Sequence, residues 1–196
     1  MLTLGEGVRA VKLARSAIDK YVRDGELFHP EKLPTKFSEK RGVFVTLHKN
    51  GLRGCIGYPY PTMPLGEAII DSAINSAKND PRFMPVRAEE LDEITIEVTV
   101  LTPPRLIHAK PTTLPQKIEI GKHGLIVTKG GNQGLLLPQV AIEHQFDEEE
   151  FLSQACMKAG LYPDSWLEED TQIHVFEGQI FAENSPAGDI GEKKII

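Results

Sequence analysis

The chain has 196 residues, of which 40% are hydrophobic and 26% charged, and its formal net charge is −6. That composition is typical of a globular protein and excludes the disordered, collagen-like and coiled-coil classes. The acidic excess lies in residues 101–196, because residues 1–100 hold 14 basic and 14 acidic side chains. The sequence has no strongly basic stripe, so we do not expect a dedicated DNA-binding protein.

The N-terminal segment and the cysteines bear on location. Residues 4–22 have apolar positions near helical spacing, which predicts an amphipathic helix rather than a signal peptide. No run of 18 apolar residues occurs, so we expect no membrane-spanning helix. The two cysteines, Cys55 and Cys156, are 101 residues apart, which favours a reduced, cytoplasmic protein without a disulfide framework.

The first half of the chain predicts a hairpin, a helix and a strand. β-Branched and aromatic residues dominate 42–47, and an Asn-Gly turn joins this strand to a second one at 52–57. A helix is predicted to begin at Pro64 and to stop before Asp80. A further strand, with clear period-two alternation, follows at 94–101.

The second half repeats that plan. Residues 124–128 resemble residues 42–46 at an offset of 82. They too lead into a turn, an apolar return strand at 135–137 and a helix begun by a proline, and a late strand is predicted at 171–182. We interpret this pattern as a degenerate internal duplication.

The duplicated pattern predicts an α+β fold. We expect a mostly antiparallel, barrel-like sheet built from the two hairpin–helix–strand units, with outer helices and a smaller subdomain. The whole chain, 1–196, is expected to form a single domain with two subdomains. The polar residues 184–196 are expected to be a loose tail.

Several signatures of known sites are absent from the sequence. The Gly-rich segment 129–134 lacks both the ending of a phosphate-binding loop and the spacing of a dinucleotide fingerprint, so we interpret it as a hairpin turn. There is no C-x-x-C or H-E-x-x-H motif, and the six histidines are scattered singly. We therefore expect neither a metal nor a cofactor.

Cys55 is the leading candidate for a functional residue. Alternation along the strand puts Arg53, Cys55 and Gly57 on one face and Gly54 on the other. An arginine beside a thiol favours the thiolate, which is the nucleophilic form, and glycines allow a ligand to approach the backbone closely. The alternative is that Cys55 packs in the interior, as free cysteines commonly do.

Three other positions have a simpler or an open interpretation. Cys156 falls in the apolar stripe of a predicted helix, which indicates a core residue. Arg82 follows a helix stop, where it either bonds free backbone groups or holds a carboxylate or phosphate in a cleft. Glu97 lies on the non-apolar face of its strand, where it is either solvated or turned toward a site.

Four motifs occur in a characteristic order: LRGCIG at 52–57, DPRF at 80–83, GLLLPQV at 134–140 and CMKAGL at 156–161. With them the chain closely resembles the AMMECR-type family, named after a human chromosomal-region protein, and its archaeal members in particular. The resemblance covers roughly residues 2–183, and the motif around Cys55 is the hallmark of the family.

The resemblance implies an α+β fold with a larger and a smaller subdomain. It also implies Memo-like and radical-SAM partner proteins and an action on RNA or nucleotides. At His144 relatives tend to carry a tryptophan, so we do not expect this histidine to act as a general base for Cys55, and protease or esterase chemistry is disfavoured. The site residues carried over from the family are Arg53, Gly54, Cys55 and Gly57, with Arg82 as a further candidate.

Two functions remain open. In the first, the chain is an intracellular enzyme or enzyme subunit with a cleft lined by Arg53 and Cys55. Cys55 is then a nucleophile or a contact to a reactive intermediate delivered by a partner, and Arg82 clamps an anion. In the second, it is a non-catalytic binding or adaptor module. That module would use the same cleft for a peptide, RNA or small ligand, or the acidic face at 147–150 for a partner.

Overall fold

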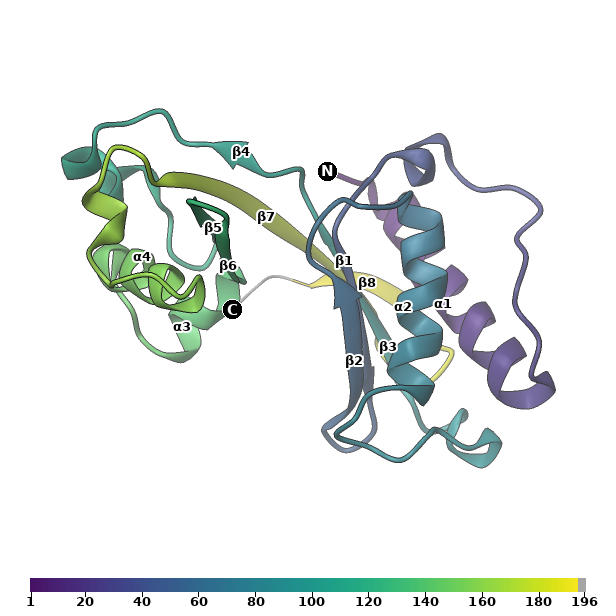
Figure 1. Ribbon diagram of the computed structural model, residues 1–196. Helices are drawn as coiled ribbons and strands as arrows, with labels where there is room; N and C mark the ends of the chain where they lie inside the picture. The colour runs from purple at the N-terminus through teal and green to yellow at the C-terminus, as the bar shows by residue number, and fades with distance from the viewer. Residues whose placement is uncertain (194–196) are drawn as a thin grey trace. The chain divides into compact units, whose positions relative to one another are not determined.

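The computed structural model describes residues 1–193 and has an α+β fold with antiparallel strands (Figure 1). The chain forms two compact units. The first unit comprises residues 1–101 and the described residues from 179 onward, and the second comprises residues 102–178. One long strand, β7 (Gln172–Glu183), contributes residues to both units.

The first unit is an antiparallel sheet with two helices against one face (Figure 1). Strand β2 pairs with β1, β1 pairs with β3, and the end of β7 lies between β3 and β8. The elements of this unit are α1 (Leu4–Asp24), β1 (Val43–His48), β2 (Leu52–Tyr58), α2 (Leu65–Lys78), β3 (Thr95–Leu101) and β8 (Ile190–Lys193).

Side-chain alternation decides which face of this sheet the helices cover. In β1, Val43, Val45 and Leu47 are fully buried, while the residues between them are half-buried. Because successive side chains of a strand point to opposite faces, one face of the sheet packs against α1 and α2 and the other keeps the polar residues. That polar face carries Cys55.

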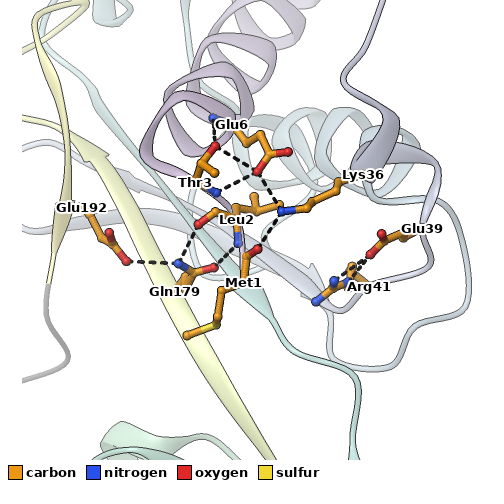
Figure 2. Close-up of polar contacts among 9 residues, drawn as sticks. All are labelled: Met1, Leu2, Thr3, Glu6, Lys36, Glu39, Arg41, Gln179 and Glu192. Carbon is orange, nitrogen blue, oxygen red and sulfur yellow. Dashed lines mark hydrogen bonds and ion pairs between the residues drawn. The ribbon is translucent and has the colours of Figure 1, made fainter.

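The N-terminus is attached to the same unit by side-chain hydrogen bonds (Figure 2). The Gln179 side chain accepts a hydrogen bond from the Leu2 N–H at 2.6 Å and donates one to the Leu2 carbonyl at 3.1 Å. Thr3 and Glu6 form a capping box that begins α1, and Lys36 bonds both Glu6 and the Met1 carbonyl. Together these contacts fix the position at which α1 starts.

The second unit is a smaller antiparallel sheet with its own core. Strand β5 pairs with β6 and with β7, which also pairs with β4. Helix α4 packs on this sheet around the fully buried Phe151, Leu152 and Cys156. The elements of this unit are β4 (Arg105–Leu106), β5 (His123–Lys129), β6 (Asn132–Leu136), α3 (Pro138–Glu143) and α4 (Glu148–Lys158), with the first part of β7.

The α+β class and the antiparallel strands predicted from the sequence are confirmed. The Asn-Gly turn between β1 and β2 has the expected positive φ angles, 54° at Asn50 and 129° at Gly51. Both units contain a hairpin, then a helix, then a strand paired with the first strand of the hairpin. That the two units come from a duplicated segment stays a prediction.

The expectation of a loose C-terminal tail is wrong for residues 190–193. These residues form β8, which pairs with β7, and the Asn184 N–H bonds the Asp189 carbonyl at the turn between the two strands. The polar composition reflects exposure of a short strand rather than disorder, because pairing with β7 satisfies its backbone whatever its side chains are. The remainder of the expected tail, residues 194–196, lies outside the described residues.

Candidate functional site

Cys55 lies in β2, the strand that ends the sheet of the first unit. Its backbone groups are bonded by side chains from the loop after α2. The Asp80 carboxylate accepts a hydrogen bond from the Cys55 N–H at 2.8 Å, and Arg82 Nη2 donates one to the Cys55 carbonyl at 3.2 Å. An edge strand otherwise offers such groups to another chain. The DPRF motif therefore covers the strand edge at Cys55 and holds its backbone in place.

Asp80 and Arg82 also bond each other. The Asp80 side chain is only 2% exposed, and it accepts hydrogen bonds from Arg82 Nε at 2.9 Å and from Nη2 at 2.7 Å. These bonds to the guanidinium, reinforced by the backbone N–H of Cys55, hold the pKa of the Asp80 carboxyl well below its usual range. Of the two interpretations of Arg82, bonding of free backbone groups is the one that the contacts display, and its role as an anion clamp stays a prediction.

The Cys55 thiol is half-buried on the polar face of the sheet, opposite Thr46 of β1. Since the Cys55 backbone groups point away from β1, the two residues form a non-hydrogen-bonded pair, in which side chains lie close together. The Thr46 hydroxyl donates to Cys55 Sγ at 3.3 Å. This contact places a hydroxyl donor directly against the sulfur of Cys55.

Gly54 allows helix α2 to approach β2 very closely. A Cβ atom at Gly54 would lie 2.2 Å from the carbonyl oxygen of Ser76 in α2. At this point the Ser76 hydroxyl accepts a hydrogen bond from the Ile56 N–H at 2.8 Å and donates one to the Val45 carbonyl at 2.7 Å, so it bridges β1 and β2. Gly54 thus faces its own helix, and its contact with a ligand stays a prediction.

Gly57 and Arg53 are likewise engaged by their own chain. A Cβ atom at Gly57 would lie 2.2 Å from the carbonyl oxygen of Val43. Both Arg53 Nε and Nη2 donate to the Glu90 carboxylate at 3.0 Å, and these bonds lower the pKa of Glu90 to about 2. The Arg53 guanidinium also lies 5.9 Å from the ring centroid of Phe83. A catalytic role for Arg53 and a ligand contact for Gly57 stay predictions.

Glu97 lies in one cross-strand row with Cys55. Thr46 is paired with Cys55 on one side and with Glu97 of β3 on the other, so all three side chains share the polar face. The Glu97 carboxylate is 3.5 Å from Lys193 Nζ and 3.9 Å from His48 Nε2. Alternation predicted the face on which Glu97 lies, but its partners depend on strand register and on β8, which the sequence did not reveal.

This arrangement combines a thiol, a hydroxyl and a carboxylate on an accessible, polar surface. Across a row of adjacent strands, neighbouring residues are about 5 Å apart, so a small substrate could contact Cys55 and Glu97 together. Within residues 1–193, no three His, Cys, Asp or Glu side chains gather closely enough to hold a metal ion. Independence from metals and cofactors stays a prediction.

Two residues that the sequence analysis excluded from the candidate site, Cys156 and His144, lie in the second unit. Cys156 is fully buried, which confirms it as a core residue, and burial raises the pKa of its thiol to about 11. His144 is exposed at the end of α3, where its ring stacks on Phe146 with the centroids 5.2 Å apart.

The fold and the site define an α+β protein of two units with a thiol on the polar face of an edge strand. The chain belongs to the AMMECR1 family, whose model matches residues 11–181. It is 54% identical to a protein of Methanosarcina acetivorans over 99% of this chain and 100% of that protein. It is 53% identical to a protein of Thermococcus gammatolerans over 95% of this chain and 94% of that protein.

A solved structure supports the same assignment. The crystal structure of the uncharacterized protein PH0010 from Pyrococcus horikoshii matches with a TM-score of 0.84 and 50% sequence identity, over 98% of each chain. The names of these relatives state no activity. Among residues 1–193, no helix combines the length and the apolar character that crossing a membrane requires.

Proposed function

We propose that this chain is a cytoplasmic enzyme or enzyme subunit whose reactive group is the Cys55 thiol. The observation that carries the proposal is the contact of Thr46 with Cys55 Sγ on an accessible sheet face, in the same row as Glu97. Both cysteines are free thiols, which suits a reducing compartment. The backbone bonds from Asp80 and Arg82 would keep the thiol in a constant position.

In this proposal Cys55 acts as a nucleophile. The thiol loses its proton to solvent, and the Thr46 hydroxyl donates to the resulting thiolate. The sulfur then attacks an electrophilic carbon of the substrate, and the electron pair of the bond that breaks leaves with the departing group. Glu97 would bind a donor group of the same substrate.

We further propose RNA or a nucleotide as the substrate, and Memo-like and radical-SAM proteins as partners, from the family resemblance stated above.

Arg53 and Arg82 favour a second candidate function, a binding or adaptor module. Their guanidiniums lie 5.9 Å and 5.5 Å from the same Phe83 ring, and the neighbouring Met84 is 79% exposed. Arginine, aromatic and methionine side chains are enriched at protein interfaces.

Alkylation by iodoacetamide tests the nucleophile. The thiolate displaces iodide and forms a thioether, and mass spectrometry distinguishes Cys55 from Cys156 in the folded protein. We expect Cys55 to be alkylated at pH 7 and the buried Cys156 to stay unmodified. Thr46→Val should slow the reaction of Cys55. The control, Thr99→Val, removes a hydroxyl from the same face of the sheet. Thr99 of β3 is paired with Phe44 rather than with Cys55, so this variant should not slow the reaction of Cys55. A Cys55 that reacts only after unfolding rules out the nucleophile.

Binding of a fluorescent single-stranded RNA oligonucleotide tests the substrate class and separates the two functions. If the site is catalytic, the wild type should form a covalent product with an electrophilic analogue of the oligonucleotide and Cys55→Ser should not, although both proteins bind the oligonucleotide equally well. If it is a binding module, the wild type should form no covalent product either, and Arg53→Ala should weaken binding. RNA that does not bind at all would exclude it as the substrate.

A further inference from the structure

A pocket in the first unit lies away from Cys55, between helix α1 and the segment that follows it. The cavity has a volume of about 420 Å³, which falls in the range of small-molecule sites. Helix α1 contributes Arg9, Lys12, Leu13 and Ser16, and the segment contributes residues 28–33.

The inner wall of this pocket is apolar. Leu13 is buried in the core of the unit, and Phe28 and Leu33 are half-buried side chains packed against that core. A ligand with an apolar body would cover the remaining exposed area of Phe28 and Leu33, which removes apolar surface from water. Ser16 adds a hydroxyl to the same wall.

The rim of the pocket is basic in a chain that is acidic overall. Arg9, Lys12 and Lys32 are exposed at the rim, against a single carboxylate, Glu31. In the described part of the chain, none of these three cations belongs to an ion pair, whereas Arg23 and Arg82, which are also exposed in the first unit, each have an acidic partner. The three positive charges are therefore available to a ligand.

Arg9 is held in an orientation that suits an anion. Its Nη2 atom donates to the Lys32 carbonyl at 3.3 Å, so it connects the helix to the opposite wall. A guanidinium has five N–H donors in a planar fork, and the donors that do not bond Lys32 can bind a carboxylate or phosphate.

We propose that this pocket binds a small amphiphilic anion, with a carboxylate or phosphate head group on an apolar body. The head group lies at the basic rim against Arg9 and Lys12, and the apolar body lies on Phe28 and Leu33. This site is independent of the Cys55 site and of the function proposed for it.

Titration with the fluorescent anion 8-anilinonaphthalene-1-sulfonate tests the site, because this probe combines a charged group with aromatic rings. Arg9→Gln and Lys12→Gln should each weaken binding by about tenfold, the loss expected for one charge-assisted hydrogen bond. Lys158→Gln removes the same charge from an exposed position in the second unit and should leave the affinity unchanged. Equal affinities in all three variants would overturn the proposal.

Competition identifies the head group and the location. Octanoate or octyl phosphate should displace the probe, and the more effective of the two distinguishes carboxylate from phosphate. Octyl glucoside below its micelle concentration should not displace it, and displacement by this neutral compound would contradict the role of charge. Octanoate should also shift the amide NMR signals of Ser16 and Phe28. Shifts confined to the second unit would place the binding elsewhere and refute the site.

Discussion

The Asp80 carboxylate accepts a hydrogen bond from the backbone N–H of Cys55 at 2.8 Å, although the two residues are 25 positions apart. Two of the four sequence motifs thus meet at this bond. The DPRF segment supplies one acceptor and, through Arg82, one donor to the edge of β2. It therefore supports the strand that carries the thiol, and its first effect is on the stability of that strand.

Asp80→Asn should lower the free energy of unfolding by about 1.5–3 kcal/mol at pH 7. The substituted amide lacks the negative charge to which Arg82 and the Cys55 N–H donate hydrogen bonds. The pKa of Asp80 is lower in the folded protein than in the unfolded chain. Its contribution is therefore complete above the unfolded value of about 4 and is lost as the pH falls toward the folded value. Urea denaturation at pH 7 and pH 3 checks both statements. The exposed Asp164→Asn is the control, and a difference that does not shrink at pH 3 would contradict the expectation.

Gly54→Ala should destabilise the protein by about 1–3 kcal/mol, because the new Cβ would lie 2.2 Å from the Ser76 carbonyl oxygen and would push α2 away from β2. Gly191→Ala in β8 is the matched control, since a Cβ added there would meet no atom within 4 Å. Thermal unfolding followed by circular dichroism compares the two variants. Equal melting temperatures would mean that the close packing at Gly54 is not required.

The two cysteines should respond differently to the same substitution. Cys156→Ser places a hydroxyl in the apolar core of the second unit and should cost about 1–3 kcal/mol. Cys55→Ser should change stability by no more than about 0.5 kcal/mol, because Cys55 is half-buried and serine can keep the contact with Thr46. Denaturant titrations of both variants test the difference, and the reverse order would show that Cys55 is the core residue.

Glu183→Gln should be destabilising, by up to about 3 kcal/mol, because it removes the closer of the two carboxylates that face the nearly buried Arg15 and leaves only Asp19, at 3.7 Å. Glu183 is 5% exposed and also accepts a hydrogen bond from the Ile96 N–H at 3.0 Å, so it connects α1, β3 and β7. The exposed Glu89→Gln removes the same charge without that connection. Urea denaturation of both variants measures the effect, and equal losses would exclude a role for the buried pair.

Local patterns were sufficient to predict most elements of this fold. Alternation at 94–101 predicted β3, and the Asn-Gly turn predicted the hairpin of β1 and β2. Short polar strands were not predictable in this way. Strands β4 and β8 exist because β7 is long enough to pair with each of them, and a two-residue or four-residue strand has too few positions to display a pattern.

Sequence alone determined the residue types of the candidate site and the strand faces on which they lie, because side-chain period depends only on local backbone geometry. It identified Cys55 and indicated that Cys156 belongs to the core. Tertiary structure alone decided which charges meet. Arg53 bonds Glu90, and Glu97 shares a row with Cys55, because strand register and the return of the chain after α2 bring together residues that are far apart in sequence.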